Sequence, residues 1–575
     1  MINPDRSGDT LPHSVPGTSG EVEDALADLV SKLTGLGYSS SLVHETLGPK
    51  GESAVRAGNP GAAAWVLDND CSSLPEHRIL TSAIYLRRPH PIEDLHRLFD
   101  QESVATFISL GIFQPVRRDL HEIADPASAK ELSRYVLMID VRPVAVPSHT
   151  ECEVLVASDA DASSYAFVPG PNHVPGVGHA PLSLLNVIPS LTPEPMDVLD
   201  LGCGSGVLSL VLAAANPQAK IVATDIHDRA LMFARASAQS LPDDAGTIDW
   251  REGNWFEPVE GQKFDLIVSN PPFVMGPAEV GHVYRDSGLE LDGASALVVS
   301  ESARFLREGG RAHLLAGWAV TPDTSRESKL SRWLPSHDIN GWAVQRSEVD
   351  VPTYVTTWLT DESIDPRSPE GRTKSSSWLD FFAAHKVTSI GLGWVHLERR
   401  EGPTELLVES LEHPLSSGTF LGADVAEYFQ RHDWLSSATP EVITGSCYRV
   451  RPGVALEEVS VADATSLQGF LPYRTKICRT DGPAWAHELD GHVQAVIAGL
   501  HPDGLALEDV AELYCTVNDL DTEAFLGALV PIIVDLVRHG IVLPAELVGH
   551  CPSDQEGNST PNGNAAQLGD AKEGE

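Results

Sequence analysis

Cysteine is scarce in this sequence of 575 residues, and its placement excludes two kinds of site. The chain has seven cysteines, which stand far apart and form no Cys-x-x-Cys pair. Disulfide frameworks and zinc sites need paired or regularly spaced cysteines, so neither is expected. No group of His, Asp and Cys has the spacing of metal ligands either. We therefore expect no metal, and mostly single, buried thiols in a reducing cytoplasm.

Basic residues and long apolar runs are also few. Lys and Arg number 40 against 81 Asp and Glu, which gives a formal net charge of −41 at pH 7. This excess favours a soluble protein and argues against broad electrostatic attraction to nucleic acid or an anionic membrane, although it is compatible with a local basic groove. No apolar run reaches the roughly 18 residues of a membrane helix. The N-terminus also lacks a secretory signal, so the sequence predicts a cytoplasmic protein that does not enter a membrane.

Composition divides the chain into three folded regions between two tails. Residues 1–19 and 551–575 are rich in Gly, Ser, Asp and Pro or Asn, with no apolar period, and are expected to be disordered. Residues 20–145 have helical periodicity, and residues 91–112 are typical of a helix-turn-helix, which indicates a winged-helix-like domain. A central region with alternating strand-like and helix-like segments is placed at 146–365. Residues 366–550 are expected to form an α+β domain.

A short pattern occurs near both ends of the chain. A helical segment is closed by Gly-Ile-x-x-Pro at Gly111–Pro115 and again at Gly540–Pro544. Glycine stops a helix in the left-handed conformation and proline prevents its continuation, so ordinary capping used twice explains the pattern. Alternatively the pattern is a true repeat, and a winged-helix-like recognition module lies at each end.

The central region alternates strand-like and helix-like segments. The expected strands are 198–201, 221–224, 248–251 and 266–269, and the expected helices are 208–216 and 229–240. This order predicts an α/β fold with a mainly parallel, doubly wound sheet. Right-handed crossovers then bring Asp200, Asp225 and Asn270, each at a strand end, to one edge of the sheet.

A glycine-rich turn follows the first of these strands. Its sequence is Asp200-Leu-Gly202-Cys203-Gly204-Ser-Gly206. Glycines permit a close turn, and the following helix start offers backbone N–H groups. The third glycine comes one residue too early for the dinucleotide pattern Gly-x-Gly-x-x-Gly. The spacing therefore favours S-adenosylmethionine, whose sulfonium and amino groups suit an acid such as Asp200.

Two further strand ends complete the predicted cofactor site. Asp225, followed by Ile226, lies 19 residues beyond Gly206, where a carboxylate accepts hydrogen bonds from both ribose hydroxyls; capping of the next helix is the alternative. Asn254 and Trp255 supply an amide and an aromatic surface for adenine.

The motif Asn270-Pro271-Pro272-Phe273 indicates the acceptor. The side-chain carbonyl of Asn270 and the backbone carbonyl of Pro271 both accept from one NH₂ group, and two prolines hold that geometry. Phe273 then stacks on a flat acceptor. The alternative is a strand that ends at two prolines beside a buried Phe.

With both motifs present, residues 145–360 resemble the class I S-adenosylmethionine-dependent methyltransferases of the Asn-Pro-Pro-aromatic group. The group includes release-factor glutamine, ribosomal RNA guanine-N2 and adenine-N6 methyltransferases, and the domain layout resembles a large actinobacterial form. The resemblance implies a Rossmann-like seven-stranded sheet. It implies that Asp200 and the three glycines hold the methionine part, Asp225 the ribose and Asn254 the adenine, and that residues 270–273 are catalytic and position the acceptor nitrogen.

Two neighbouring segments are expected to belong to the same site. A loop with Gly176 and Gly178 precedes the first motif strand, where related enzymes cover the cofactor. Arg285 and Asp286 follow the acceptor motif and are candidate substrate contacts, with a local ion pair as the alternative.

Three substrates fit these features. RNA, favoured as ribosomal RNA, agrees with Phe273 and the helix-turn-helix, although the only basic clusters are 87–88, 117–118 and 474–479. A protein glutamine, as in a release factor, offers the same planar NH₂ group. A non-catalytic, S-adenosylmethionine-sensing protein that binds nucleic acid is the third alternative.

Overall fold

The chain divides into two compact units. A computed structural model describes residues 9–10, 17–69, 73–118, 134–147, 149–160, 170, 172–272, 274–276, 288–362, 364–413 and 420–548. The first unit is Met1–Pro414 and the second is Leu415–Glu575. The first unit therefore extends past residue 365, the predicted end of the methyl-transfer domain. It also includes the region predicted to be a separate N-terminal domain.

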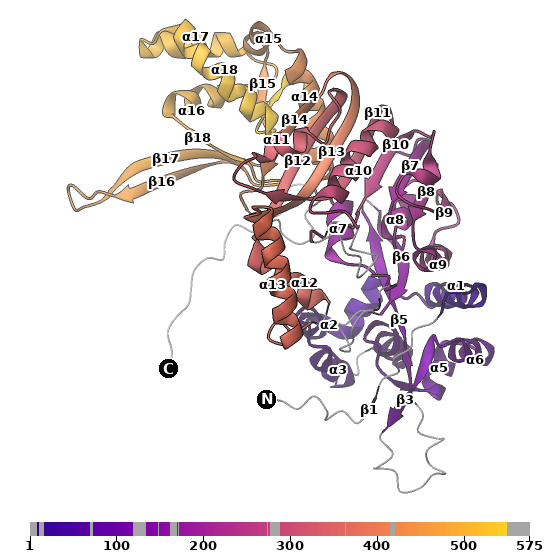
Figure 1. The fold of residues 1–575 in the computed structure, drawn as a ribbon. Helices are drawn as coiled ribbons and strands as arrows, with labels where there is room; N and C mark the ends of the chain where they lie inside the picture. The colour runs from indigo at the N-terminus through magenta and orange to yellow at the C-terminus, as the bar shows by residue number, and fades with distance from the viewer. Residues whose placement is uncertain are drawn as a thin grey trace, which may run out of the picture. The chain divides into compact units, whose positions relative to one another are not determined.

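A large mixed sheet forms the centre of the first unit (Figure 1). In the described residues it has eight strands, one more than the seven expected. In spatial order they are β14 (Glu405–Ser410), β12 (His337–Asp350), β13 (Ser389–Pro403), β11 (Leu306–Val320), β10 (Phe264–Ser269), β7 (Met196–Leu201), β8 (Ala219–Asp225) and β9 (Thr247–Glu252).

The additional strand explains why the domain is longer than predicted. Strand β14 pairs in parallel with β12 at the edge of the sheet, and β13 pairs antiparallel with both β11 and β12. Residues 389–410 thus obtain their backbone hydrogen bonds from this sheet. The α/β class and the parallel core predicted from the sequence are confirmed, because β9, β8, β7, β10 and β11 are all paired in parallel.

Helices on the sheet bury its apolar side chains. They are α7 (His179–Leu185), α8 (Val207–Ala215), α9 (Asp228–Ser237), α10 (Gly293–Phe305) and α11 (Arg326–Ser331). Two more, α12 (Val351–Asp361) and α13 (Pro369–Ala384), are inserted between β12 and β13. The Asp350 side chain accepts the Thr353 N–H at 3.0 Å and so begins α12 directly where strand β12 ends.

The N-terminal region is helical, as predicted, with two small strand groups. Its helices are α1 (Gly20–Gly35), α2 (Ser40–Arg56), α3 (Pro60–Asn69), α4 (Pro75–Leu80), α5 (Ile92–Leu98) and α6 (Gln101–Ser109). Strands β1 (Asp9–Thr10), β3 (Phe113–Arg118), β4 (Arg134–Leu137) and β2 (His90–Pro91) form one sheet, and β5 (Ile139–Val146) and β6 (His149–Asp159) form a hairpin. Helices α5 and α6 lead into the antiparallel pair β3–β4, an order that suits a winged-helix-like module; this assignment stays a prediction.

The N-terminal helices share a hydrophobic core with the sheet domain. Leu26 and Leu29 of α1 and Phe233 of α9 belong to one cluster of buried side chains. At its rim, the Arg235 guanidinium donates two hydrogen bonds of 2.8 Å to the Glu23 carboxylate. Because this core is continuous, the predicted boundary at residue 145 does not separate two compact units.

The second unit has its own core. Its helices are α14 (Gly422–Ser437), α15 (Pro440–Gly445), α16 (Gly491–Ala498), α17 (Leu507–Asn518) and α18 (Thr522–Arg538). Strands β15 (Tyr448–Val450) and β19 (Val542–Pro544) pair with each other, and β16 (Val454–Ala462), β17 (Phe470–Arg479) and β18 (Ala486–Leu489) form a second sheet. Strands β16 and β17 form a long ribbon (Figure 1).

Both copies of Gly-Ile-x-x-Pro end a helix and begin a strand. Gly111 and Gly540 have φ angles of +77° and +63°, the left-handed conformation expected of helix-ending glycine. The following Ile112 and Ile541 are fully buried. The pattern therefore has the same local structure at both places, as capping predicts, and a true repeat stays a prediction.

Two other features are absent from the described parts of the chain. No helix there combines the length and the apolar character needed to cross a membrane. In the same residues, no three His, Cys, Asp or Glu side chains converge as metal ligands.

Candidate functional site

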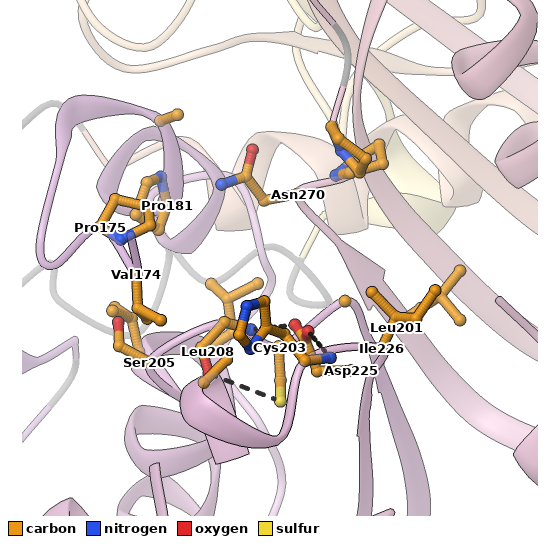
Figure 2. A pocket seen from close by; sticks show the side chains of 18 of the residues that line it. Val174, Pro175, Pro181, Leu201, Cys203, Ser205, Leu208, Asp225, Ile226 and Asn270 are labelled. Carbon is orange, nitrogen blue, oxygen red and sulfur yellow. Dashed lines mark hydrogen bonds between the residues drawn. The ribbon is translucent and has the colours of Figure 1, made fainter. Parts of the chain in front are cut away.

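A cavity of about 530 Å³ opens at the carboxyl ends of the parallel strands. Its walls come from the ends of β7, β8, β9 and β10, from the loop before α7 and from α12. The volume lies within the range of small-molecule sites, roughly 300–1,000 Å³. In Figure 2, Asn270 lies across the cavity from Cys203 and Asp225. The sheet therefore brings together side chains from strand ends that are far apart in sequence, as the strand order predicted.

The glycine turn lines this cavity and has the predicted backbone. Gly202, Gly204 and Gly206 have φ angles of +70°, +54° and +84°, which side-chain-bearing residues rarely adopt. A Cβ atom on Gly202 or Gly204 would meet no atom within 4 Å. On Gly206 it would lie 2.9 Å from the Ala234 Cβ atom. The first two glycines therefore keep the ligand space open, whereas the third permits close packing against α9.

Asp200 lies beneath the turn, fully buried. Its Oδ2 accepts hydrogen bonds from the Ser209 N–H at 3.0 Å and the Ser209 hydroxyl at 2.6 Å, which hold the start of α8. Its Oδ1 is buried and accepts no hydrogen bond in the described structure. Burial raises the pKa of Asp200 to about 7. Asp200 is not among the described residues that line the cavity, so its direct contact with the cofactor stays a prediction.

Asp225 lines the cavity at the end of β8. Its two carboxylate oxygens accept the backbone N–H groups of Gly204 and His227, each at 2.9 Å. Burial raises its pKa. The carboxylate thus connects the glycine turn to the next strand end and keeps further lone pairs for hydroxyl donors. The alternative, a plain cap of α9, is not what is seen, because the N-cap of that helix is His227.

Apolar and amide surface continues along the wall. Ile226, Asn254 and Trp255 all line the cavity, and Ile226 is 55% exposed although it is apolar. Trp255 has a φ of +47°, a strained conformation that the surrounding fold must stabilise. The Gly253 N–H donates to the Asp225 carbonyl at 3.0 Å. This hydrogen bond joins Asp225, the predicted ribose contact, to the segment that carries Asn254, the predicted adenine contact.

The predicted covering loop is present and firmly anchored. His173, Val174, Gly176 and Gly178 line the cavity. The Val174 N–H donates to the Asp159 carboxylate at 2.9 Å, and Asp159 also forms a buried ion pair with Arg229 of α9. A Cβ on Gly176 would clash with the Ser158 hydroxyl, so a larger residue there would require this part of the loop or the Ser158 side chain to move.

The acceptor motif begins at the end of β10, next to the glycine turn. The Ser269 hydroxyl donates to the Leu201 carbonyl at 2.8 Å and joins the two strand ends. Asn270, Pro271 and Pro272 line the cavity, and the Asn270 Oδ1 is buried without a hydrogen-bond partner in the described structure. Such an orphan acceptor suits an N–H donor from a ligand. Phe273, Arg285 and Asp286 lie outside the described residues.

Helix α12 also contributes to the site, which the sequence did not predict. The Tyr354 hydroxyl accepts the Met275 N–H at 2.8 Å and so holds the chain just after the acceptor motif. Trp358 and Asp361 line the cavity. These three residues have the spacing i, i+4, i+7, which places them on one helix face. That spacing is visible in the sequence, but only the sheet topology shows that this face meets the Asn270 loop.

The residues present fit S-adenosylmethionine. The acidic Asp200 and Asp225 suit a cationic cofactor, Gly202 and Gly204 leave open space, and Ile226 with Trp255 offers an apolar surface for a purine. Burial also raises the pKa of the Cys203 thiol well above its usual value, which keeps it a neutral part of the wall.

Comparison with known proteins agrees with this geometry. Residues 180–317 match the family model described as the methyltransferase small domain. This region is a class I S-adenosylmethionine-dependent methyltransferase domain. The match extends from α7 to β11 and thus includes the glycine turn, Asp225 and Asn270. The predicted methyltransferase resemblance is confirmed at the level of this domain.

The methyltransferase domain is similar to two kinds of curated protein. A release factor glutamine methyltransferase from Xylella fastidiosa is 40% identical over 130 residues, 21% of this chain and 45% of that protein. Ribosomal RNA small subunit methyltransferase C from Actinobacillus succinogenes is 40% identical over 121 residues, 21% of this chain and 32% of that protein. The chain thus spans less than half the length of each.

A solved structure and a second family model complete the comparison. The Thermus thermophilus 16S rRNA N2 G1207 methyltransferase, in complex with AdoMet and guanosine, is 20% identical, with a TM-score of 0.24 over 49% of this chain and 66% of that one. Residues 426–544 match a domain of unknown function (DUF7782). This match coincides with the second unit.

Proposed function

We propose that this protein is an N-methyltransferase that transfers a methyl group from S-adenosylmethionine to a planar NH₂ group. The observation that carries the proposal is the buried, unpaired Asn270 Oδ1 at the strand end next to the glycine turn. Two prolines follow it and restrict the backbone. The unpaired oxygen supports a role for Asn270 in accepting a hydrogen bond from an N–H group of the acceptor.

The residues of this protein align the acceptor amine with the methyl group. The cofactor supplies the methyl group: as the N–C bond forms, the C–S bond breaks with its electron pair left on sulfur, and the nitrogen loses one proton to water. Asn270 and the Pro271 carbonyl orient the amine so that its lone pair faces the methyl carbon. The covering loop, held by Asp159, restricts water.

An RNA base is the favoured acceptor. Trp358 gives the cavity an aromatic wall next to the Asn270 loop, which suits stacking of an extruded base. Helices α5 and α6 with β3 and β4 supply a candidate recognition module. A protein glutamine is the second candidate, and its support is the similarity to a release factor glutamine methyltransferase.

Tritium-labelled methyl transfer separates the two acceptors. Undermethylated ribosomal subunits and release factors, assayed side by side, are expected to give label in the RNA. Label in the release factor alone would select the protein glutamine. Label in neither, with normal cofactor binding, would overturn both candidates.

Two variants test which residue serves the acceptor and which serves the cofactor. Asn270→Ala is expected to lower turnover by at least about 100-fold, because the amine loses its acceptor, while the Kd for S-adenosylmethionine stays within a few-fold. Asp225→Ala is expected to weaken cofactor binding by about 10-fold or more, because hydrogen bonds to a charged group are lost. Calorimetry and single-turnover assays measure both quantities. The opposite pattern would mean that Asn270 serves the cofactor and Asp225 the acceptor.

A further inference from the structure

Helix α12 presents one face to the acceptor side of the cavity. Tyr354, Trp358 and Asp361 lie on this face, and Trp358 and Asp361 are cavity-lining residues. Tyr354 is 2% exposed and is fixed by the Met275 N–H at 2.8 Å, three residues after Pro272. This hydrogen bond ties the helix to the Asn270 loop, so the other two side chains have a defined position relative to the acceptor motif.

Packing of aromatic and aliphatic side chains holds helix α12 against α13 and the chain after the acceptor motif. Tyr354 packs edge-on against Trp358, with ring centroids 5.9 Å apart, and against Phe382 of α13 at 6.0 Å. The core of this helical pair also contains Val355, Leu359 and Met275. A helix packed in this way holds a side chain more precisely than a loop does.

The chemistry of the two lining residues differs from that of Asn270. Asn270 offers an amide oxygen to the reacting amine, whereas Asp361 offers a carboxylate, which only accepts hydrogen bonds when it is ionised. Trp358 offers a flat aromatic surface. Together they suit a planar acceptor that carries a second N–H donor next to its amine. A carboxylate would repel a carbonyl oxygen or an unprotonated ring nitrogen in that position.

We propose that Asp361 and Trp358 determine acceptor specificity, with Asp361 accepting the ring N–H next to the reacting amine and Trp358 stacking on the ring. The acceptor edge with this pattern is that of guanine, whose N1–H lies beside its 2-amino group. An adenine edge has an unprotonated N1 there, and a glutamine amide has a carbonyl oxygen. This inference rests on the proposed N-methyltransferase function and names its substrate class.

The test compares two bases that both carry the 2-amino group. One short RNA contains guanine at the target position, and the other contains 2-aminopurine, which has no N1–H. The full-length protein is expected to favour guanine by about 10- to 100-fold in kcat/KM, the usual effect of a hydrogen bond to a charged group. Asp361→Asn is expected to reduce or reverse this preference, because an amide can also donate to the bare N1.

Controls separate specificity from folding and from cofactor binding. Asp380→Asn changes an exposed Asp on the neighbouring helix α13 and is expected to keep the wild-type preference. Trp358→Phe retains an aromatic ring and is expected to keep most activity, whereas Trp358→Ala is expected to raise KM by about 10-fold. Calorimetry with S-adenosylmethionine should give a Kd within a few-fold of the wild-type value for all four variants.

The failures are distinguishable. If Asp361→Asn keeps the wild-type preference for guanine, or weakens cofactor binding as much as it lowers activity, the role of Asp361 is overturned while the proposed function stands. If the wild type methylates neither RNA but methylates a protein glutamine, the favoured acceptor is wrong, and the specificity inference fails with it.

Discussion

At the scale of single residues, the site depends on a few groups whose burial changes their chemistry. Asp200 is fully buried, its Oδ1 has no hydrogen-bond partner in the described structure, and burial raises its pKa to about 7. A buried carboxylate is costly until a cation lies near it. The free protein therefore keeps Asp200 partly protonated near neutral pH, and a cationic cofactor favours the ionised form.

This coupling predicts pH-dependent cofactor binding. The raised pKa of Asp200 means that binding of S-adenosylmethionine releases a proton below about pH 7. Affinity is then expected to rise with pH, by up to about 10-fold per unit, and to level off above pH 7. Calorimetry in buffers of different ionisation enthalpy measures the released proton. Asp200→Asn should remove the pH dependence, and an unchanged slope in that variant would assign it to another group.

A second prediction at this scale concerns two glycines of the same turn. In Gly206→Ala, the new Cβ would meet Ala234 at 2.9 Å, so the free energy of unfolding is expected to fall by about 1–3 kcal/mol. In Gly204→Ala, the φ of +54° strains the backbone, but the Cβ meets no atom within 4 Å, so a smaller loss of stability and weaker cofactor binding are expected. Urea unfolding and calorimetry measure the two effects. Equal destabilisation without any loss of binding in Gly204→Ala would contradict this assignment.

At the scale of elements, the sequence predicted the central strands and helices well. Strands β7, β8, β9 and β10 contain the expected segments, because buried parallel strands have continuous apolar runs that end at polar residues. The predicted site residues Asp200, Asp225 and Asn270 lie at or next to the ends of these strands. The prediction was incomplete where the sheet becomes antiparallel: β14 pairs at the edge, and its half-buried residues have no strong pattern.

Helix α12 illustrates what local pattern does not reveal. Its sequence predicts a helix, because Asp350 caps it and Pro352 lies in its first turn. Nothing in that segment says which face meets the Asn270 loop. Only the insertion of α12 and α13 between two paired strands decides it, because the strands fix both ends of the helical pair.

At the scale of the whole molecule, the two units are expected to fold independently of each other. Each unit has its own hydrophobic core. Residues 1–413 expressed alone are therefore expected to unfold cooperatively and to bind S-adenosylmethionine within a few-fold of the full chain, and residues 420–548 are expected to fold alone. Thermal unfolding and calorimetry measure this. A shorter fragment, 146–365, is the control and should be unstable, because it lacks β13, β14 and the α1 side of the core.

The sequence by itself determined the cofactor of this protein and predicted the kind of acceptor, a planar NH₂ group. Strand ends, glycine spacing and the Asn-Pro-Pro motif are local features, and backbone geometry gives each a defined shape. The tertiary structure alone decided the extent of the domain, the position of Asp200 beneath the cavity and the contribution of Trp358 and Asp361. These depend on contacts between segments distant in the chain, which form only when the sheet and its inserted helices bury their apolar faces together.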